Sequence, residues 1–506
     1  MFRSAWRFEI KGAFSSFWQR HPALFFSLCI LLGTAAPFCL PWLLFLFLVA
    51  LCSYSKQKQI WILASLCFFG AFFATSYRFP KITLPQEKIQ GKGIFHIDEV
   101  KIQSSPFNKS ILYKGTLKNF ETKEKKAYHD LPCHIYLPLF GKRPPANVDY
   151  EITGTLCQKG DYLFVLKPEK KGRWIPIPSF FNLSEWRFNA KQSLSHYLKK
   201  EISDPRARSF LNALATGAID ERILSLEFGK VGLQHILAIS GFHFALVALF
   251  LNFIFRFIFS YRISTALLIV TLTLYYLFLG NAPSIQRAYI AISLVAIGQL
   301  FSLRTSGLNA LGVGLMIELL FNPLVVTQLS FQLTFLCTLA ILLFYPLSYR
   351  AISLLLPERS YGDAQQLTPL DRHGYLLSSL LRHAFALNFA VHLISLPVTL
   401  FLFHKFPLLS IIYNLFFPVC VSFSMLLLFT SLFFAPWLPF LSHAIHAIDN
   451  RWTSMMLTLT SNPPAFLDFS LRTKSISLSS LLCFLAITFF FGIIFYEKEH
   501  VAKISV

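Results

Sequence analysis

The sequence predicts a polytopic α-helical membrane protein with a small β domain inserted outside the cytoplasm. Hydrophobic residues make up 55% of the 506 residues and charged residues only 14%, whereas about 25% are charged in ordinary globular proteins. Apolar runs close to the ~20 residues of a membrane-spanning helix recur along the chain. One segment, 78–175, interrupts them. This composition excludes a water-soluble enzyme and a disordered chain, because neither could accommodate so much apolar surface.

Residues 1–77 begin with a segment in which aromatic and basic residues mix, from Phe2 to Arg20. This mixture predicts an amphipathic segment at the cytoplasmic face. Three spans follow, two short ones within 23–54 and a third from about Ile60 to Tyr77. A cleaved signal peptide is the alternative, but the basic stretch is long and more spans follow at once. Three crossings from a cytoplasmic N-terminus place residues after Arg78 outside the cytoplasm.

Residues 78–175 predict a β domain. In the run YEITGTL, Ile152, Gly154 and Leu156 alternate with polar residues, which is the period of a half-buried strand. From 78 to 200 we count 22 Lys and Arg against 11 Asp and Glu, a net charge of +11 within the +21 of the chain. A basic domain outside the cytoplasm suits a phosphate-rich ligand. A merely solvated basic surface is the alternative.

Two cysteines, Cys133 and Cys157, fall in this polar region. Because the domain lies on the oxidising side, we expect them to form a disulfide, with two buried thiols as the alternative. The sequence contains no Cys-x-x-Cys pair, no H-E-x-x-H motif and no Walker loop. We therefore expect no metal site, no cofactor and no ATPase or nuclease activity in this chain.

Residues 176–230 predict an amphipathic helical connector. Asp204-Pro205 is a helix start signal and Gly217 a stop signal. Residues 231–506 then predict a membrane domain of about eight spans, near 233–258, 263–280, 285–302, 306–321, 324–348, 384–404, 407–435 and 476–495. Residues 437–461 are more amphipathic, so we expect them to lie in the interface or to re-enter the membrane.

The stretch GLQHILAISGFHFALV, residues 232–247, carries His235, Ser240, Gly241 and His243 where a span should be apolar. An ionisable group within a span indicates function by default. Ser240-Gly241 permits a break, because non-helical backbone is tolerated where it lines a cavity. The alternative is a tight helix–helix contact in which the histidines are hydrogen-bonded.

Further polar residues fall in later spans. Arg287 follows Ser284 at the head of one span, where it either lines a polar path or snorkels to the membrane surface. Gln332 lies one helical turn after Gln328. We expect a polar lumen inside the bundle, lined by His235, Ser240, Gly241, His243, Ser284, Arg287, Gln332 and Asn414.

The stretch 232–247 resembles the signature motif of the ComEC family of competence proteins, Gly-x-x-His-x-Leu-Ala-x-Ser-Gly-x-His. It is met by Gly232, His235, Leu237, Ala238, Ser240, Gly241 and His243. The similarity continues through GNAPSIQRAYI, LLFNPLVVTQLSFQLTF and SLPVTLFLFHKFPLLSIIYNLFFP. The similarity in sequence covers roughly 205–435. Residues 1–204 are similar to the family in their layout, which is spans followed by a β domain.

The resemblance implies a multi-pass channel of the plasma membrane that carries single-stranded DNA into the cytoplasm during natural transformation. It also implies that the external domain is OB-like. Such folds bind single strands through basic grooves and stacking aromatic rings. We expect DNA contacts from Lys114, Lys118, Lys123, Lys125, Lys126 and Phe120.

Many members of the family end in a metallo-β-lactamase-like nuclease domain. This sequence stops at Val506, just after the last predicted span, so we expect a form that lacks that domain. Single-stranded DNA and membrane lipid are the expected partners, with a separate nuclease and a cytoplasmic DNA translocase as further ones. The alternatives are a transporter of another solute and an intramembrane enzyme that uses Ser240 and His243 on a lipid-linked substrate. No carboxylate near that pair in sequence would orient a base.

Overall fold

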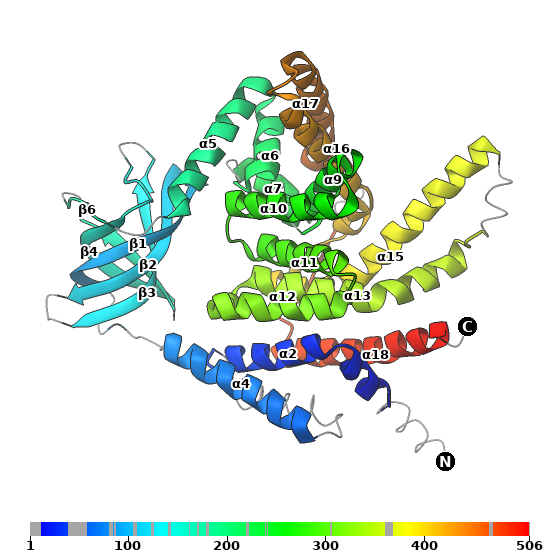
Figure 1. Cartoon of the computed structure of the whole chain (residues 1–506), viewed down its shortest axis with the longest axis horizontal. Coiled ribbons are helices and arrows are strands. Elements are labelled where there is room, and N and C mark those ends of the chain that lie inside the picture. The colour runs from blue at the N-terminus through cyan, green and yellow to red at the C-terminus, as the bar shows by residue number, and fades with distance from the viewer. Residues whose placement is uncertain are drawn as a thin grey trace.

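The computed structural model describes residues 12–38, 58–79, 84, 88–104, 109–122, 126–139, 143–160, 162–169, 172–178, 182–218, 222–237, 239, 241–303, 306–359, 368–464 and 469–504. Figure 1 shows a bundle of helices with a β barrel at one end. The chain is thus a helical protein that carries a separate β domain, as the sequence predicts.

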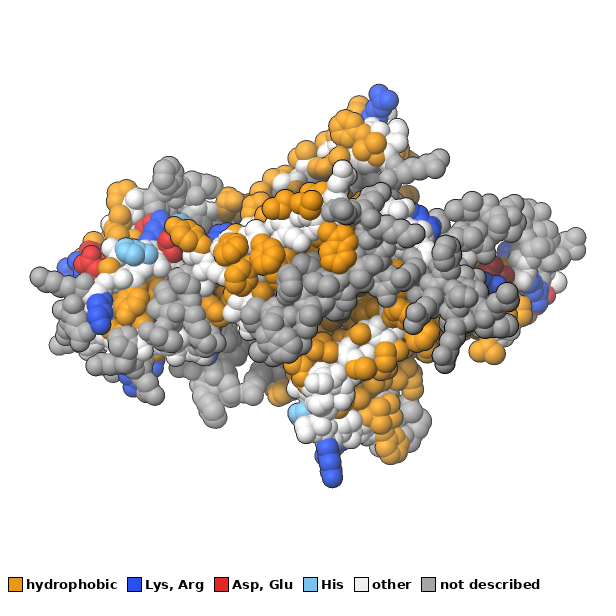
Figure 2. All heavy atoms as spheres, turned by 90° about the horizontal axis from the view of Figure 1, so that it is seen from below, with side chains coloured by type: hydrophobic (Ala, Val, Ile, Leu, Met, Phe, Trp, Pro, Cys, Tyr) orange, Lys and Arg blue, Asp and Glu red, His pale blue; other side chains and the backbone are white. Residues whose placement is uncertain are grey.

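Seven helices of the described residues are long and apolar enough to cross a membrane. They are α4 (Lys58–Arg78), α9 (Gly241–Ile258), α10 (Tyr261–Leu279), α13 (Leu329–Leu355), α15 (Pro369–Phe403), α16 (Leu409–Phe434) and α18 (Leu478–Ile504). Two apolar helices are shorter, α2 (Pro22–Ala35) and α12 (Gly307–Phe321). Large apolar side chains point outward, such as Phe257 at 87% exposure, and hydrophobic side chains dominate the middle of the face in Figure 2. Lipid accounts for this exposure, so the protein is a multi-pass membrane protein.

The remaining helices surround or connect these spans. They are α5 (Leu183–Glu201), α6 (Pro205–Thr216), α7 (Arg222–Lys230), α8 (Gln234–Leu237), α11 (Pro283–Leu300), the 3₁₀ turn η1 (Pro323–Thr327) and α17 (Pro439–Ser461). The Asp204 side chain caps α6, and Gly217 ends it in the left-handed conformation with φ 73°. Both signals were readable in the sequence. A short ladder of β7 (Lys405–Pro407) and β8 (Ser470–Arg472) closes the loop before α16.

The β domain is a closed barrel. Its strands are β1 (Lys88–Ser104), β2 (Lys109–Thr122), β3 (Ala127–Pro138), β4 (Asp149–Gly160) and β5 (Leu163–Pro168), with β6 (Ile175–Ile177) added beside β4. The order is β1-β2-β3-β5-β4, and β1 pairs with β4 as well as β2. The β3–β5 pair is parallel and the others are antiparallel. Gly115 allows the tight β1–β2 approach, because a Cβ there would lie 1.9 Å from the carbonyl oxygen of His96.

The expected disulfide between Cys133 and Cys157 is wrong for this structure, in which both are free thiols. Cys133 on β3 pairs with Phe164 of β5, and Cys157 on β4 pairs with Val165 on the other side of β5. Neighbouring strands lie about 4.8 Å apart. The two cysteines are thus about two strand spacings apart, beyond the ~4.4–6.8 Å that a bridge requires between Cα atoms.

Residues 12–20 form a helix that packs on the bundle rather than lying wholly in the interface. Phe14 and Phe17 are buried in a core that contains residues of α12, α13 and α18. Arg20 forms an ion pair with Glu497 near the end of α18. The aromatic face of this N-terminal helix packs against protein rather than lipid, because α18 lies beside it. Residue 20 and the end of α18 are therefore on the same side of the bundle, opposite the barrel (Figure 1).

Helix α17 packs along α16 and buries its polar face. His446 contacts Tyr197 of α5 and Ser431 of α16, with distances of 3.3 and 3.2 Å. Ser424 of α16 hydrogen-bonds to Thr453 at 2.9 Å. These bonds explain why a segment that looks amphipathic in the sequence lies against protein.

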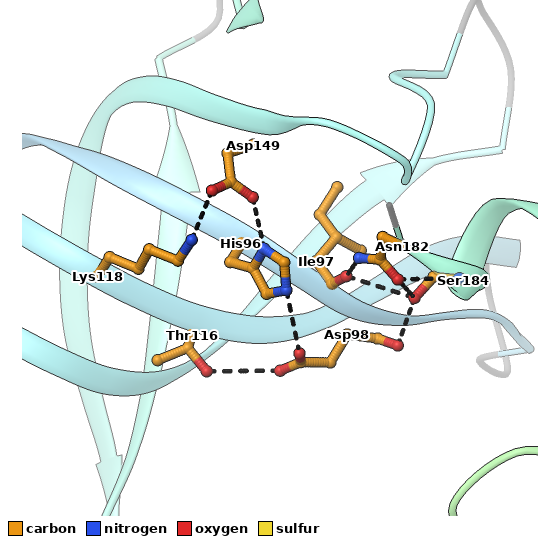
Figure 3. A network of polar contacts seen from close by, with 8 residues as sticks. All are labelled: His96, Ile97, Asp98, Thr116, Lys118, Asp149, Asn182 and Ser184. Atoms are coloured by element: carbon orange, nitrogen blue, oxygen red, sulfur yellow. Dashed lines mark hydrogen bonds and ion pairs between the residues drawn. The ribbon is translucent and has the colours of Figure 1, made fainter. Parts of the chain in front are cut away.

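The barrel is attached to the bundle by α5. At the start of α5, Asn182 and Ser184 donate to the carbonyls of Ile97 and Asp98 on β1 (Figure 3). Glu185 of α5 pairs with Arg143. Further along, Arg187 Nε donates to the carbonyl of Leu277 at 2.8 Å. The first half of α5 thus bonds both to the barrel and to the C-terminal end of α10.

Asp149 accepts two of the bonds drawn in the barrel network of Figure 3. It receives bonds from His96 and from Lys118 Nζ, the latter at 2.7 Å. Burial disfavours its charged form, but these bonds outweigh burial and lower the pKa of the carboxyl. The strands β1, β2 and β4 meet at this carboxylate.

We expect Asp149→Ala to destabilise the barrel by about 1–3 kcal/mol, because it removes a buried carboxylate together with its bonds to His96 and Lys118. The measurement is amide hydrogen exchange of β1, β2 and β4 in the full chain at pH 7. Glu151→Ala is the matched control: Glu151 pairs with Lys92 at 2.6 Å but is more exposed, so its loss should cost about 0–1 kcal/mol. Equal protection in the two variants would contradict the central role of Asp149.

Candidate functional site

The stretch 232–247 is a broken helix. Helix α8 ends at Leu237 and α9 begins at Gly241, with Ile239 outside both. Ser284 at the head of α11 donates to the carbonyl of Ile239 at 2.8 Å. A carbonyl released from a helix inside a membrane needs such a donor. The break that the sequence permits at Ser240-Gly241 is therefore present and is supported by a side chain from another helix, although Ser240 itself lies outside the described residues.

Gly232 fixes α8 against the start of α16. It has φ 74°, a conformation that favours glycine. A Cβ at this position would lie 2.5 Å from Cβ of Ser410 and 3.3 Å from Cγ of Pro407. The glycine that opens the stretch therefore serves close backbone packing.

Three histidines come together from three elements. His235 of α8 lies near His392 of α15, and His243 in the first turn of α9 lies near His235. His243 is 2% exposed. The His235 side chain is accessible although its ring lies deep among neighbouring helices. A polar path within a bundle requires such a side chain, which is surrounded by helices and is still accessible.

These histidines do not form a metal centre. Within the part of the chain that the structure describes, no group of three His, Cys, Asp or Glu side chains has a metal-binding arrangement. His392 Nδ1 instead lies 2.8 Å from the carbonyl oxygen of Asn388. That hydrogen bond orients the His392 ring beside His235.

Arg287 of α11 lies beside the break. Its Nη2 is 3.3 Å from where a Cβ on Gly241 would be, and its Cζ is 5.8 Å from the centre of the Phe335 ring. Nη1 is buried and has no hydrogen-bond acceptor among the described residues. Gly241 thus leaves room for the guanidinium, and this cation retains donors for a polar or anionic ligand.

Glu318 of α12 is the acidic neighbour of Arg287. Its side chain is 1% exposed, it interacts electrostatically with Arg287, and neither carboxylate oxygen has a hydrogen-bond donor among the described residues. Our sequence reasoning missed this residue. The signal was present, because Glu318 is the one ionisable residue in the apolar run GLNALGVGLMIELLF.

Gln332 and Asn414 are the other predicted lining residues that the structure describes. Gln332 is exposed, and its amide donates to the carbonyl of Val326 at 2.9 Å, where it closes the turn between η1 and α13. Asn414 is half-buried on α16. The structure therefore gathers His235, Gly241, His243, Ser284 and Arg287 around the break, and adds His392 and Glu318.

On the barrel, the expectation that Phe120 stacks on a base is wrong. Its side chain is fully buried in the barrel core. A register shift opposite Ile94 and Phe95 changes the phase of β2 just before Phe120. Such a bulge exchanges the inward and outward faces of a strand. Tyr136 on β3 is instead an exposed ring, 36% accessible, with Lys159 Nζ 5.8 Å from its centre.

The predicted lysines have different surroundings. Lys114 pairs with Glu99 at 3.6 Å and Lys118 with Asp149 at 2.7 Å. Lys126 is exposed. Lys123 and Lys125 lie outside the described residues.

Comparisons with known proteins place these features in a family. A family model described as "Competence protein" matches residues 216–499. The chain is also 25% identical over 225 residues to "ComE operon protein 3" of Bacillus subtilis (strain 168). That match covers 43% of this chain and 26% of the relative, so the chain spans about a quarter of the relative's length. No solved structure matches.

We expect Gly232→Ala to destabilise the bundle, by about 1–2 kcal/mol from the left-handed backbone alone and further from the contact with Ser410. Thermal unfolding of the detergent-purified protein is the measurement. Gly374→Ala on α15 is the control, because a Cβ there meets nothing within 4 Å. Ser410→Gly in the Gly232→Ala background should recover part of the loss. Unfolding like wild type in Gly232→Ala would contradict the packing role.

Proposed function

Because the chain belongs to the competence protein family, we propose that it is a channel that carries single-stranded DNA across the plasma membrane into the cytoplasm during natural transformation. The observation that carries this proposal is the broken helix of α8 and α9, at which accessible His235 and the incompletely paired Arg287 lie inside a multi-pass bundle. The break falls within the residues that match the family model.

The chemistry of the break suits a phosphate chain. Hydrogen bonds from the accessible His235 and the charge of Arg287 can meet phosphates, with His243 buried beside them, and the start of α9 adds the positive end of a helix dipole. Conduction also requires that the anion is not held too tightly. Glu318 near Arg287 provides that balance, because it reduces the net charge of the site. We propose Ser240, Gly241 and Ser284 as further lining residues.

We propose that the barrel is an OB-type domain that receives DNA outside the cytoplasm. The support is its closed five-strand order with β1 between β2 and β4. The N-terminus and the end of α18 would then both be cytoplasmic, since Arg20 and Glu497 pair at the opposite end of the bundle.

We propose four regions of the chain: the N-terminal spans in 1–77, the barrel in 78–175, the helical connector in 176–230 and the channel domain in 231–506. A nuclease and a DNA translocase are proposed as separate partners, and no observation favours an intramembrane enzyme or another solute.

We expect Arg287→Gln and His243→Ala to reduce DNA uptake at least roughly tenfold, equivalent to about 1.4 kcal/mol, while membrane abundance stays near normal. The physical reason is the loss of charge and hydrogen bonds toward the strand, since both groups lie at the break rather than against lipid. Transformation frequency and protein abundance are measured in a strain that carries the variant as its sole copy.

Arg262→Gln is the control for that experiment, because Arg262 is an exposed arginine at the start of α10. A gene deletion shows whether uptake depends on this protein at all. If abundance falls in parallel with uptake, the residues stabilise helix packing and the lumen assignment is wrong.

We expect the barrel, expressed as residues 78–201 to retain α5, to bind single-stranded DNA weakly and mainly through phosphates. The slope of log affinity against log salt should be about −0.7 for each phosphate contacted. Fluorescence anisotropy of a labelled oligonucleotide measures it. Binding at low salt no better than that of a neutral β domain would contradict DNA contact by the barrel.

A further inference from the structure

A strip of positive charge crosses the junction between the barrel and the bundle. It consists of Lys101 on β1, Lys114 on β2, and Arg187 and Lys191 on α5, which we call the junction strip. Glu99 on β1 is the acid within it, 2.8 Å from Lys101 Nζ and 3.6 Å from Lys114 Nζ. Four cations thus share one close carboxylate.

The strip reaches the rim of the membrane bundle. Lys191 Nζ donates to the carbonyl of Leu279 at 2.7 Å, and Arg187 Nε donates to Leu277 at 2.8 Å, both at the C-terminal end of α10. Gly280 has φ 92°, and a Cβ there would lie 3.3 Å from Arg187. The chain then enters α11 at Pro283 and reaches Arg287 about one turn later. The junction strip therefore lies between the barrel surface and the broken helix.

The charge of the strip is not balanced by the residues that the structure describes. Burial, then repulsion from Lys101, lowers the pKa of Lys191 to about 8, against about 10.4 for a free lysine. Burial and Lys101 also lower the pKa of Lys114. Gathering these cations is therefore costly, and a bound anion would relieve the cost.

On the barrel the strip continues into an exposed aromatic ring. Lys114 pairs across the β2–β3 ladder with His134, and Tyr136 follows two residues later on the same face of β3. Burial, then Lys114 and Lys159, lowers the pKa of His134 to about 4, so this ring is neutral at pH 7. A neutral ring, an accessible tyrosine and flanking lysines are the elements that bind single strands by stacking and charge.

We propose that the junction strip binds backbone phosphates of single-stranded DNA and passes the strand from the barrel to the broken helix. This inference rests on the proposed function. Anionic lipid headgroups share the phosphate chemistry. The exposed Tyr136, which follows His134 on the barrel strand β3, favours nucleic acid, because an aromatic ring can stack on a base.

The test is fluorescence anisotropy of a labelled oligothymidine with the full chain in phosphatidylcholine nanodiscs. Lys191→Gln and Lys101→Gln should each weaken affinity roughly three- to tenfold and reduce the salt slope by about 0.7. Glu99→Gln should strengthen binding, because it removes the one acid. Lys191→Arg should bind like wild type. Lys92→Gln is the matched control, because Lys92 is also a barrel lysine paired with a glutamate, Glu151 at 2.6 Å.

The pH dependence of oligonucleotide affinity is a further measurement, and a purely structural role of Lys191 would not change it. Lys191 is charged below a pKa of about 8, so wild-type affinity should fall between pH 7 and 9 and Lys191→Arg should show a flatter profile. The groups that face Lys191 are Glu99 and Lys101 on β1, Arg187 on α5 and, beyond Arg187, Tyr276 on α10. Burial disfavours the charged form of Glu99, but its lysine neighbours outweigh burial and lower the pKa of its carboxyl, so Glu99 stays ionised over this range.

Binding unchanged in Lys191→Gln, or weakened in Glu99→Gln, would overturn the inference. A second result would also overturn it. If phosphatidylglycerol nanodiscs, at fixed salt, abolish oligonucleotide binding by the wild type, and this lipid effect is absent in the strip variants, then anionic lipid headgroups occupy the site. Failure of the proposed function is distinct: a gene deletion would leave transformation unchanged. If deletion abolishes transformation while strip variants bind and transform like wild type, only the junction strip is rejected.

Discussion

The hydrogen bond from Ser284 to the carbonyl of Ile239 allows a helix to be interrupted inside an apolar bundle. Backbone groups in a membrane have no water to compensate them, so a break needs a donor from another helix. Once the break exists, Gly241 can approach α11 and leave room for the guanidinium of Arg287. The positions of His243, at the start of α9, and of His235, in the short helix α8, follow from the same interruption.

Helix α5 extends the consequences of this arrangement to the barrel. Arg187 and Lys191 place their charges on the last carbonyls of α10, a favourable location for cations at the negative end of a helix dipole. The start of α5 meanwhile bonds to β1 through Asn182 and Ser184. Bonds from the first half of α5 to both β1 and α10 hold a basic barrel at one end of the membrane bundle (Figure 1).

Some local features were predictable because they depend on neighbours in sequence. The cap at Asp204, the stop at Gly217 and the break before Gly241 were each readable from residue types with strong backbone preferences. The pairing of Cys133 with Cys157 was not, because it depended on which strands are adjacent. Insertion of β5 between β3 and β4 separates the two cysteines, and no local pattern specifies that order.

The sequence by itself determined the membrane class, the β insertion and the polar stretch 232–247, because composition and periodicity report directly on lipid burial and strand alternation. Only the tertiary structure decided which polar groups meet. Glu318 approaches Arg287 because α11 and α12 pack together, and Phe120 turns inward because a bulge shifts the phase of β2. Contacts between distant residues depend on packing and register, and the same local sequence is compatible with several of them.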